Sequence, residues 1–508
     1  MWYGLTNKLT FPRYSKSTCV QAIPIQTPLQ APEILETLPQ KGAFLLESQG
    51  SSDPSLAAYT FLGAEPYRVV IAYRDQIEIE EQGLVVKRTG DALELLAQYL
   101  KETERSHDPS LPPFQTGAVG FLSYDMGRRF EVLPALAKDE LQTPDVYFAF
   151  YDVILSIRKV DGSVQLLMAP QPGCEEQTRL KADGWLKRIQ CLNFRDAVIS
   201  DSMSAIASLP VENRNGLTRA ETSQEANVGS TGIRSTFTRD AYLQAVGRAI
   251  DYIYAGDVFQ VNLSQRFAAA WTLPAIELYK KVRRLNPAPF GAYLDCGKFA
   301  VVSSSPERFL KWECRGASLH LETRPIKGTR PRGREAMEDA RLRESLQKSE
   351  KDQAELAMIV DLMRNDLGKI CEYGSVVVPD RRRVEPYATV FHTVATIEGQ
   401  LRANCGLPEI LRATFPGGSI TGAPKVRAME IIEELEPVRR GVYCGSIGYI
   451  GCTQTADLNI AIRTFVVKDG TAYFHAGGGV VADSDPLAEY EETLHKVRAL
   501  FEALGERG

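Results

Sequence analysis

Several features that would define common protein classes are missing from this 508-residue chain. No apolar run approaches the ~20 residues needed to cross a bilayer, and the N-terminus lacks the continuous apolar stretch of a signal peptide. The formal charge is −5, so no dominant basic face is indicated, which argues against general nucleic-acid binding. We therefore expect a cytoplasmic protein that binds neither membrane nor nucleic acid.

Metal-binding and nucleotide-binding signatures are also missing. The nine cysteines, an odd number, are scattered without a Cys-x-x-Cys pair, which favours reduced thiols over a disulfide framework or a zinc site. The five histidines show no helical pairing, which gives no sign of a zinc enzyme. The segment Gly417–Lys425 resembles a phosphate-binding loop only in part, because Ala423 and Pro424 precede its lysine and no Ser or Thr follows. We discount ATP and GTP.

What is present is an ordinary globular composition, 44% hydrophobic and 24% charged, in a chain long enough for roughly two to three domains. Residues 15–197 mix short strands and helices. Val146–Leu155 predicts one buried strand, and Ser163–Met168 follows a hairpin signal at Asp161-Gly162. Residues 198–236, rich in Ser, Thr, Asn, Gly and Glu, are interpreted as a flexible linker or insertion.

Residues 237–506 form the second predicted region. It begins with an amphipathic helix near Thr238 and continues with a strand at Val258–Leu263. A further strand at Leu458–Val467 is followed, after a Lys-Asp-Gly turn, by another at Tyr473–Ala476. These patterns predict α/β material with substantial antiparallel pairing.

The segment Pro325–Gly333 is the most informative in the chain. Lys327 lies between an apolar residue and a glycine, with three arginines nearby and prolines that stiffen the loop. Neighbouring cations and partial burial lower the pKa of a lysine, which frees its amine as a nucleophile. The same cations would attract a small anion. The alternative is a solvated basic loop.

Two predicted helices offer glutamates. Ser349–Asp352 is typical of a helix start, and Glu355 follows within the nearly all-apolar run Ala354–Val360, which predicts a buried helix. Asp485 and Pro486 predict the start of a C-terminal helix, which carries Glu489, Glu492 and Lys496 on one face. Together these carboxylates would suit Mg²⁺. The alternatives are a structural salt bridge for Glu355 and a solvated face for the other residues.

Glu307 follows a predicted strand that ends near Ser303. A glutamate at a strand end can act as a general acid when its surroundings raise its pKa. Its alternative role is an ion pair with Arg308. Gly477–Gly479, also after a predicted strand, indicates either close backbone approach to a ligand or a bend.

Taken together, these segments resemble the chorismate-utilising enzymes. The resemblance covers at least residues 240–505, and weaker similarity at Leu45–Ser48 resembles the start of the family's tryptophan-binding region. The family motifs matched are Asp257–Arg266, Ser305–Phe309, the Lys327 loop, Met358–Asp366, Phe415–Met429 and Gly477–Glu492.

Within that family, residue 327 separates the branches. Anthranilate synthase large subunits usually have alanine there, whereas aminodeoxychorismate synthases have lysine, as this chain does. Gln260 occupies the place where isochorismate and salicylate synthases carry a lysine that activates water. The resemblance therefore implies ammonia as the nucleophile and 4-amino-4-deoxychorismate, a precursor of 4-aminobenzoate and folate, as the product.

The resemblance also implies roles for individual positions. Lys327 would attack the ring of chorismate while Glu307 protonates the leaving hydroxyl, and His392 matches an active-site histidine. Glu355 and Glu492 match Mg²⁺ ligands, with Glu489 as a water-mediated one. The positions that match substrate contacts are Gly328, Thr329, Tyr449, Arg463, Gly477, Gly478, Gly479 and Lys496.

The implied fold is an α/β sandwich of two large antiparallel-rich sheets with helices outside, formed from both halves of the chain. The implied ammonia source is a separate glutamine amidotransferase subunit, because none of the nine cysteines lies in the Gly-x-Cys-x-Gly setting of a glutaminase.

Two other functions stay open at this point. Anthranilate synthase component I shares every implied site except residue 327, and a tryptophan site at Glu47 and Ser48, or near Asn286–Pro289, would be its regulatory feature. The second is a non-catalytic tryptophan-binding relative. This alternative is the weaker one, because the chain retains Glu307, Lys327, Glu355 and Glu492.

Overall fold

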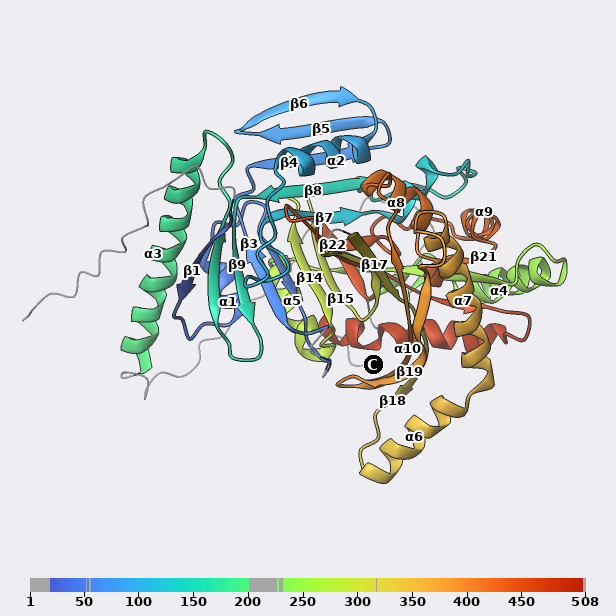
Figure 1. Ribbon diagram of the computed structural model, residues 1–508. Helices are drawn as coiled ribbons and strands as arrows, with labels where there is room; N and C mark the ends of the chain where they lie inside the picture. The colour runs from blue at the N-terminus through green and yellow to red at the C-terminus, as the bar shows by residue number, and fades with distance from the viewer. Residues whose placement is uncertain are drawn as a thin grey trace, which may run out of the picture.

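Two large β-sheets face each other in the computed structural model and carry helices on their outer sides (Figure 1). The structure describes residues 19–51, 53, 56–200, 226–227, 232–316 and 318–505. Every strand pairing within those ranges is antiparallel. The predicted fold class, an antiparallel-rich α/β sandwich, is therefore confirmed.

The first sheet has 13 strands and mixes both halves of the chain. Its order is β1 (Gln21–Ile25), β10 (Val164–Met168), β9 (Val153–Arg158), β3 (Tyr59–Gly63), β2 (Phe44–Glu47), β14 (Phe290–Asp295), β15 (Ala300–Ser305), β24 (Thr464–Lys468), β25 (Thr471–Val480), β13 (Gln260–Ala270), β12 (Arg234–Ser235) and β11 (Ala226–Asn227), with β21 (Gly422–Ala423) beside β13.

The second sheet has 12 strands and is mixed in the same way. Its order is β18 (Ile326–Pro331), β20 (Val390–Gln400), β17 (Ser318–Arg324), β16 (Arg308–Arg315), β23 (Ala456–Asn459), β22 (Ser446–Gly451), β7 (Gly117–Leu122), β8 (Val146–Tyr151), β4 (Arg68–Tyr73), β5 (Gln76–Glu81) and β6 (Leu84–Thr89), with β19 (Val377–Pro386) beside β20.

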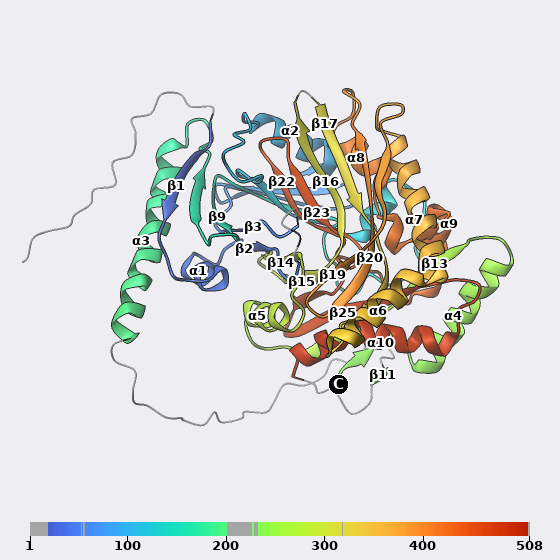
Figure 2. The same ribbon diagram turned by 60° about the horizontal axis from the view of Figure 1, so that its bottom comes forward.

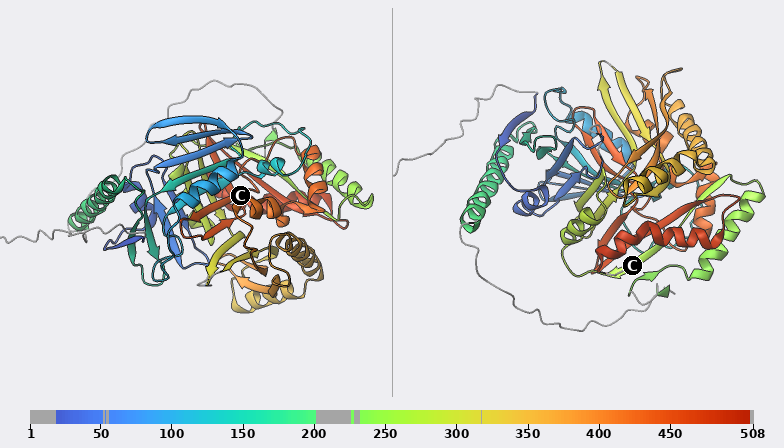
Figure 3. Two further views of the ribbon diagram at one scale, coloured as in Figure 1. Left: turned by 45° about the horizontal axis from the view of Figure 1, so that its top comes forward. Right: turned by 90° about the horizontal axis from the view of Figure 1, so that it is seen from below.

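Nine of the ten α-helices in the described residues cover the outer faces, and Figures 2 and 3 show the helices around the sheets. Helices α1, α3, α5 and α10 pack on the first sheet, α4 and α9 pack over β13 and β25, and α2, α7 and α8 pack on the second sheet. Helix α6 projects from the body at the bottom of Figure 1. The bounds are α1 (Ala31–Thr37), α2 (Ala92–Glu102), α3 (Glu175–Ser200), α4 (Arg239–Tyr254), α5 (Ala275–Leu285), α6 (Ala336–Lys348), α7 (Glu350–Gly368), α8 (Leu407–Thr414), α9 (Lys425–Leu435) and α10 (Pro486–Ala503).

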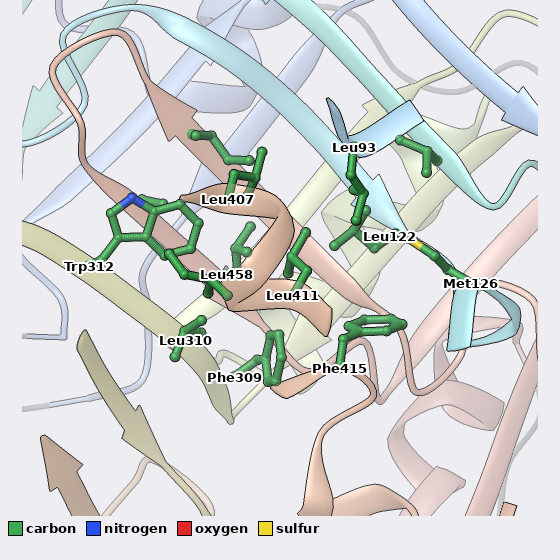
Figure 4. Packing of buried hydrophobic residues seen from close by; sticks show 14 of the residues in the cluster. Leu93, Leu122, Met126, Phe309, Leu310, Trp312, Leu407, Leu411, Phe415 and Leu458 are labelled. Atoms are coloured by element: carbon green, nitrogen blue, oxygen red, sulfur yellow. The ribbon is translucent and has the colours of Figure 1, made fainter. Parts of the chain in front are cut away.

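Aromatic side chains fill the space between the sheets. Phe61 of β3 lies edge-on to Phe114 and Tyr449, with ring centroids 5.4 and 5.7 Å away. A separate core lies between the second sheet and its helices, where Trp312, Leu411 and Phe415 pack together with leucines from several elements (Figure 4). Burial on both sheet faces explains why many strands read as continuous apolar runs.

Because strands buried on both faces form continuous apolar runs, two predicted strands were wrong in extent: each is in fact two strands. Val146–Leu155 forms β8 in the second sheet and β9 in the first, and the chain crosses between the sheets at Asp152. The Asp152 carboxylate is buried there and accepts a hydrogen bond from Lys181 Nζ at 2.6 Å. The Leu458–Val467 run is likewise divided between β23 and β24, in different sheets.

The predicted helix starts are confirmed. Thr238, Ser349 and Asp485 are N-caps whose side chains accept backbone hydrogen bonds from the first turns of α4, α7 and α10. The interpretation of α7 as apolar on most sides was wrong, because Ala354 and Ala357 are exposed. Alanine lengthens an apolar run in sequence without requiring burial.

The predicted regions 15–197 and 237–506 contribute strands to the same two sheets. Most of the predicted linker, 198–236, lies outside the described residues, but β12 at its end pairs with β13. Within the described ranges, no helix is both long and apolar enough to cross a membrane.

Candidate active site

Lys327 is aimed inward by an irregularity in β18. The register between β18 and β20 shifts between Ile326 and Thr329, and Gly328 has φ +81°. A Cβ on Gly328 would lie 2.9 Å from Asp352 Cγ. Glycine suits this position both because φ is positive and because the Asp352 side chain packs so closely against it. Such bulges re-aim side chains.

The Lys327 amine lies beside β25 of the opposite sheet. A Cβ on Gly479 would lie 3.4 Å from Lys327 Nζ and 1.8 Å from Gln260 Nε2. Burial lowers the pKa of Lys327, while the Glu355 carboxylate opposes this and the Lys496 ammonium adds to it. The site thus holds an amine whose neutral form is favoured over that of an exposed lysine.

Glu307 lies close to this lysine, in the turn between β15 and β16, and is only 4% exposed. Burial raises the pKa of Glu307 to about 7, against the opposing effects of the Ser419 hydroxyl and the Lys327 charge. The Ile326 N–H also donates to Glu307 Oε1 at 3.4 Å. A carboxyl with this pKa is protonated in about half of the molecules at neutral pH, and the protonated form can donate to a leaving group.

Ser419 is a residue that the sequence analysis missed. It lies in the Gly417–Lys425 segment, which does not form a phosphate-binding loop, since Lys425 Nζ is held by Asp366 at 2.6 Å and by the Thr414 carbonyl at 3.0 Å. The Ser419 side chain is instead placed beside Glu307. The sequence signal that could have identified Ser419 is its position directly after Gly417 and Gly418.

Three charged residues of α10 converge on β25 at Gly478. A Cβ there would lie 2.9 Å from Glu489 Oε2 and 3.4 Å from Glu492 Oε1. Lys496 Nζ donates to the Gly477 carbonyl at 2.9 Å and pairs with Glu492 at 2.5 Å. The predicted Gly477–Gly479 and α10 residues are therefore brought together, and glycine leaves room beside the carboxylates.

The carboxylates were tested as a cation site. Burial raises the pKa of Glu489, and the neighbouring Glu492 adds to this while a hydrogen bond from Ser484 opposes it. Glu355 of α7 lies apart from this pair and has Lys351 Nζ 4.0 Å away. Among the described residues, no group of three or more His, Cys, Asp or Glu side chains is close enough to hold a metal. Glu489 and Glu492 do present converging oxygens, which is the donor set that Mg²⁺ takes together with water.

His392 of β20 is a buried, neutral histidine. Its Nδ1 lies 2.9 Å from the Thr329 hydroxyl, and its Nε2 has no hydrogen-bond partner among the described residues. Burial, with the Arg463 charge nearby, lowers the pKa of His392 to about 3. A neutral ring with a free buried nitrogen is suited to contact a ligand.

Arg463 is held in a left-handed backbone conformation, φ 51°, between β23 and β24. Its Nη1 donates to Asn286 Oδ1 at 3.1 Å, and within the described ranges no carboxylate lies within 4 Å of its guanidinium. Burial lowers its pKa, the usual effect of desolvation on a cation. A buried guanidinium without an acidic partner is suited to bind a carboxylate.

Tyr449 is not brought into this group. It lines a second cavity of about 120 Å³ together with Glu47 and Ser48, and its ring stacks on Phe114 at 4.5 Å. Each strand side chain points to one face of its sheet, and that of Tyr449 points into the aromatic core between the sheets.

The Glu47 carboxylate is already occupied by protein groups. It accepts two hydrogen bonds from Arg283, at 2.7 and 2.9 Å, and one from Tyr279 at 3.0 Å. Gln49 donates a fourth at 2.7 Å. Glu47 therefore holds α5 against β2. Of the two residues predicted to bind tryptophan, Ser48 is the one whose side chain these groups do not occupy.

The comparison with known proteins agrees with this architecture. The model of the chorismate binding enzyme family matches residues 41–502. This chain belongs to that family.

Its relatives carry two different names. Aminodeoxychorismate synthase component 1 of Bacillus subtilis (strain 168) is 39% identical over 88% of this chain and 89% of its own length. Anthranilate synthase component 1 of Thermus thermophilus is 40% identical over 82% of this chain and 83% of its own. A solved structure, anthranilate synthase component I from Streptococcus pneumoniae TIGR4, matches with a TM-score of 0.69 at 30% identity, over 88% of this chain and 92% of that one.

As a member of the family, the chain is a chorismate-utilising enzyme. The nearly equal identities to the two classes of relative do not choose between their products. The choice between the two products has to come from the residues around Lys327.

Proposed function

We propose that this chain is component I of an aminodeoxychorismate synthase, which converts chorismate and ammonia to 4-amino-4-deoxychorismate. The observation that carries the proposal is the Lys327 amine, buried against Gly479 and within electrostatic reach of the Glu307 carboxyl. A nucleophile and an acid side by side permit covalent catalysis. An enzyme that adds ammonia directly would have no need of this lysine.

In the proposed reaction, neutral Lys327 Nζ forms a bond to ring carbon 2 of chorismate. The two conjugated ring double bonds shift together, the bond from carbon 4 to its hydroxyl breaks, and Glu307 gives its proton to that oxygen, so that water leaves. Ammonia then adds at carbon 4, the double bonds shift back, and the lysine amine is expelled from carbon 2. Two allylic displacements replace one difficult substitution.

The remaining site residues would bind and orient the substrate. Arg463 would grip one carboxylate, and Gly328, Thr329 and Lys496 would line the ring site with Gly477–Gly479. The neutral His392 would contact the substrate through its free Nε2. Tyr449 lies in the second cavity and is left out of this set.

Mg²⁺ is proposed as the cofactor. Glu489 and Glu492 would hold it, because their oxygens converge at Gly478, and Glu355 of α7 would contribute through water. The ion would supply positive charge that neutralises the ring carboxylate.

An ammonia-supplying glutamine amidotransferase is the proposed partner. The relatives in both classes are named component 1, which implies a second subunit. Ammonium salts should replace that subunit in the test tube.

Anthranilate synthase component I is the second candidate, favoured by the 40% identity to the Thermus thermophilus relative. The cavity at Ser48 and Tyr449 would then be a tryptophan site. Because the Glu47 carboxylate is occupied by Arg283 and Tyr279, the ammonium group of an amino acid would have to bind elsewhere in that cavity.

Product identification tests the proposal directly. The protein is incubated with chorismate, ammonium and Mg²⁺, followed by 4-amino-4-deoxychorismate lyase, and the products are separated by chromatography. We expect 4-aminobenzoate. Anthranilate as the major product would establish the second candidate instead, and no Mg²⁺-dependent turnover would indicate a non-catalytic relative.

The covalent step has its own test. Lys327→Ala should lose at least 100-fold of the activity, or divert the product, and mass spectrometry of trapped wild-type enzyme should show a substrate-sized addition on the peptide that contains residue 327. Lys327→Arg, which keeps the charge but not the nucleophile, is the matched control. Full activity of that arginine variant would show that the lysine acts only as a charge.

A further inference from the structure

The three arginines that lie next to Lys327 in the sequence are all engaged by carboxylates of the protein itself. Each pairs with one acidic residue: Arg324 with Glu385, Arg330 with Asp352 and Arg332 with Asp339. The cations that were expected to attract a small anion are therefore already paired. The second and third of these pairs join β18 to α7 and to α6, which lie beside it (Figure 1).

Asp352 of α7 makes two separate contacts with the Lys327 loop. A Cβ on Gly328 would lie 2.9 Å from Asp352 Cγ and 3.0 Å from Asp352 Cβ, so the bulge in β18 rests directly on this side chain. Arg330 Nη2 donates to Asp352 Oδ2 at 3.1 Å, while Arg330 Nη1 donates to the Thr329 carbonyl at 2.8 Å. Asp352 thus holds the residue that follows Lys327 by packing and the loop beyond it by an ion pair.

These contacts are not a by-product of helix capping. An acidic residue at the third position of a helix commonly closes a capping box by accepting a hydrogen bond from the N-cap N–H. Here the N-cap Ser349 N–H donates to the Leu346 carbonyl at 3.3 Å, and the Ser349 hydroxyl alone caps α7 by accepting from the Asp352 N–H. The Asp352 carboxylate is left free to face β18.

The first turn of α7 is itself fastened to β19. Arg382 Nη1 donates to Gln353 Oε1 at 2.8 Å, and Arg382 Nη2 donates to the carbonyls of Leu346 and Ser349 at 2.9 and 3.2 Å. One guanidinium therefore spans the junction between α6 and α7. The turn that supports the Lys327 loop is fixed to the second sheet rather than held by the loop.

The same helix carries a carboxylate that acts on Lys327. Glu355 comes three residues after Asp352 and so lies on the same side of α7. Burial lowers the pKa of Lys327, and Glu355 is the charge that opposes this effect most strongly. The lysine is therefore oriented along the side of α7 that begins at Asp352.

We propose that Asp352 is a positioning residue, which fixes the Gly328 bulge to the first turn of α7 and so aims the Lys327 amine at the ring site. The inference rests on the proposed function, in which Lys327 is the nucleophile. Glycine leaves the backbone next to Lys327 less restricted than any other residue would, so the direction of the lysine has to be set from outside the loop. A reacting group needs such support from neighbouring side chains, because a displacement of about 1 Å can cost about 100-fold in rate.

The first test separates placement of the amine from substrate binding. Asp352→Asn keeps the shape of the side chain and removes its charge, whereas Asp352→Ala removes both contacts. With chorismate, ammonium and Mg²⁺, we expect kcat to fall about 10-fold and about 100-fold respectively, while KM for chorismate stays within about three-fold. Glu350→Gln removes the same charge from an exposed position in the same helical turn, and this matched control should keep kcat within about two-fold.

The second test follows the amine without any substrate. Acetic anhydride acetylates neutral amines that it can reach, and mass spectrometry compares its rate at Lys327 with that at Lys348, whose side chain is 75% exposed. In Asp352→Ala the ratio should rise about 10-fold, because the loosened loop exposes the lysine. Lys425, which is paired with Asp366 and 14% exposed, should stay as slow as in wild type. That internal reference separates a local release of the loop from general unfolding.

The possible failures are distinguishable. If the wild-type protein makes no 4-aminobenzoate from chorismate and ammonium in the coupled assay, the proposed function fails, and the acetylation ratio still decides whether Asp352 positions Lys327. If wild type makes it but both Asp352 variants keep kcat within two-fold, or lose kcat with Lys327 acetylated at the wild-type rate, the positioning role is overturned. If Asp352→Ala does not fold, Arg330→Gln decides by the same ratio, since Arg330 is the more exposed member of the pair.

Discussion

At the scale of single residues, the environment of Glu307 determines its chemistry. The same carboxyl in water would be ionised at neutral pH, but its burial between the sheets raises its pKa to about 7. Lys327 is affected in the opposite sense, since burial favours its neutral amine. Both shifts move the pair toward the protonation states that the proposed chemistry needs.

Glu307→Gln should lower kcat by about 10²–10⁴-fold, the range for loss of a general acid. In wild-type enzyme the acid form disappears as pH rises through about 7, so activity should decline above that pH. The measurement is a pH–rate profile with ammonium as nitrogen source. An unchanged profile in the glutamine variant would contradict the role of Glu307 as the acid.

Glu307 should also affect stability in a pH-dependent way. Its pKa is raised on folding, so the folded state binds the proton more tightly, and its stabilising effect is present below pH 4.5 and lost as pH rises through about 7. The loss is about 3 kcal/mol at 1.36 kcal/mol per pKa unit. Denaturant unfolding at pH 5.5 and 8 should show Glu307→Gln gaining stability relative to wild type at the higher pH. Equal differences at both values would contradict the shift.

Gly479→Ala tests how closely β25 approaches the Lys327 amine. The new methyl group would lie 1.8 Å from Gln260 Nε2 and 3.4 Å from Lys327 Nζ, so the Gln260 amide must move. A displacement of about 1 Å in a site can cost about 100-fold in rate, and we expect a loss of that order in kcat with the fold intact. Gly247→Ala is the control, because that position in α4 has open space and should gain about 0.5–1 kcal/mol in stability with normal activity. Normal activity in Gly479→Ala would show that β25 lies farther from Gln260 and Lys327 than the structure indicates.

At the scale of secondary-structure elements, a buried ion cluster fixes β19 beside the site. Glu385 accepts hydrogen bonds from Arg324 at the end of β17 and from Arg383, which also pairs with Asp53 at 2.8 Å. The Tyr387 hydroxyl donates to Glu385 at 3.2 Å, and the Tyr387 ring lies edge-on to His392 at 5.0 Å. The cluster thus joins the chain after β2 to β20, the strand that carries His392.

Glu385→Gln should destabilise the protein by about 3–5 kcal/mol, because it leaves the buried Arg324 charge without its carboxylate, whereas Arg383 is half exposed and keeps Asp53. Denaturant unfolding measures this change. Glu344→Gln breaks a pair with Lys348 on the exposed surface of α6 and should cause no measurable change. Similar small effects from both substitutions would show that the cluster contributes only weakly.

At the scale of the whole molecule, the two halves of the chain are built into common sheets. β2 pairs with β14, and β7 pairs with β22, so each sheet contains a seam between strands far apart in sequence. Neither half has a complete sheet of its own, and each would expose the aromatic core between the sheets.

Residues 1–215 and 216–508, expressed as separate chains, should therefore each fail to form a stable fold, whereas co-expression should give a complex with chorismate-dependent activity. The division leaves every described helix and strand intact. Size-exclusion chromatography and circular dichroism of each piece make the measurement, and a split inside β13 is a control that should not assemble. A stable, folded isolated half would contradict the interdependence.

The sequence by itself determined the fold class and the main helix starts, and it supplied the candidate residues of the site. Helix starts at Thr238, Ser349 and Asp485 were predictable because a cap is a local hydrogen bond. Lys327, Glu307 and the α10 glutamates could be identified as candidate site residues because they stand in distinctive motifs.

Only the tertiary structure decided which of these residues meet. It divided Val146–Leu155 between two sheets at Asp152 and placed Tyr449 in a cavity that Lys327 does not line. It also put Ser419 beside Glu307. The physical reason is that a strand buried on both faces reads the same whichever sheet it joins, and desolvation depends on neighbours contributed by distant parts of the chain.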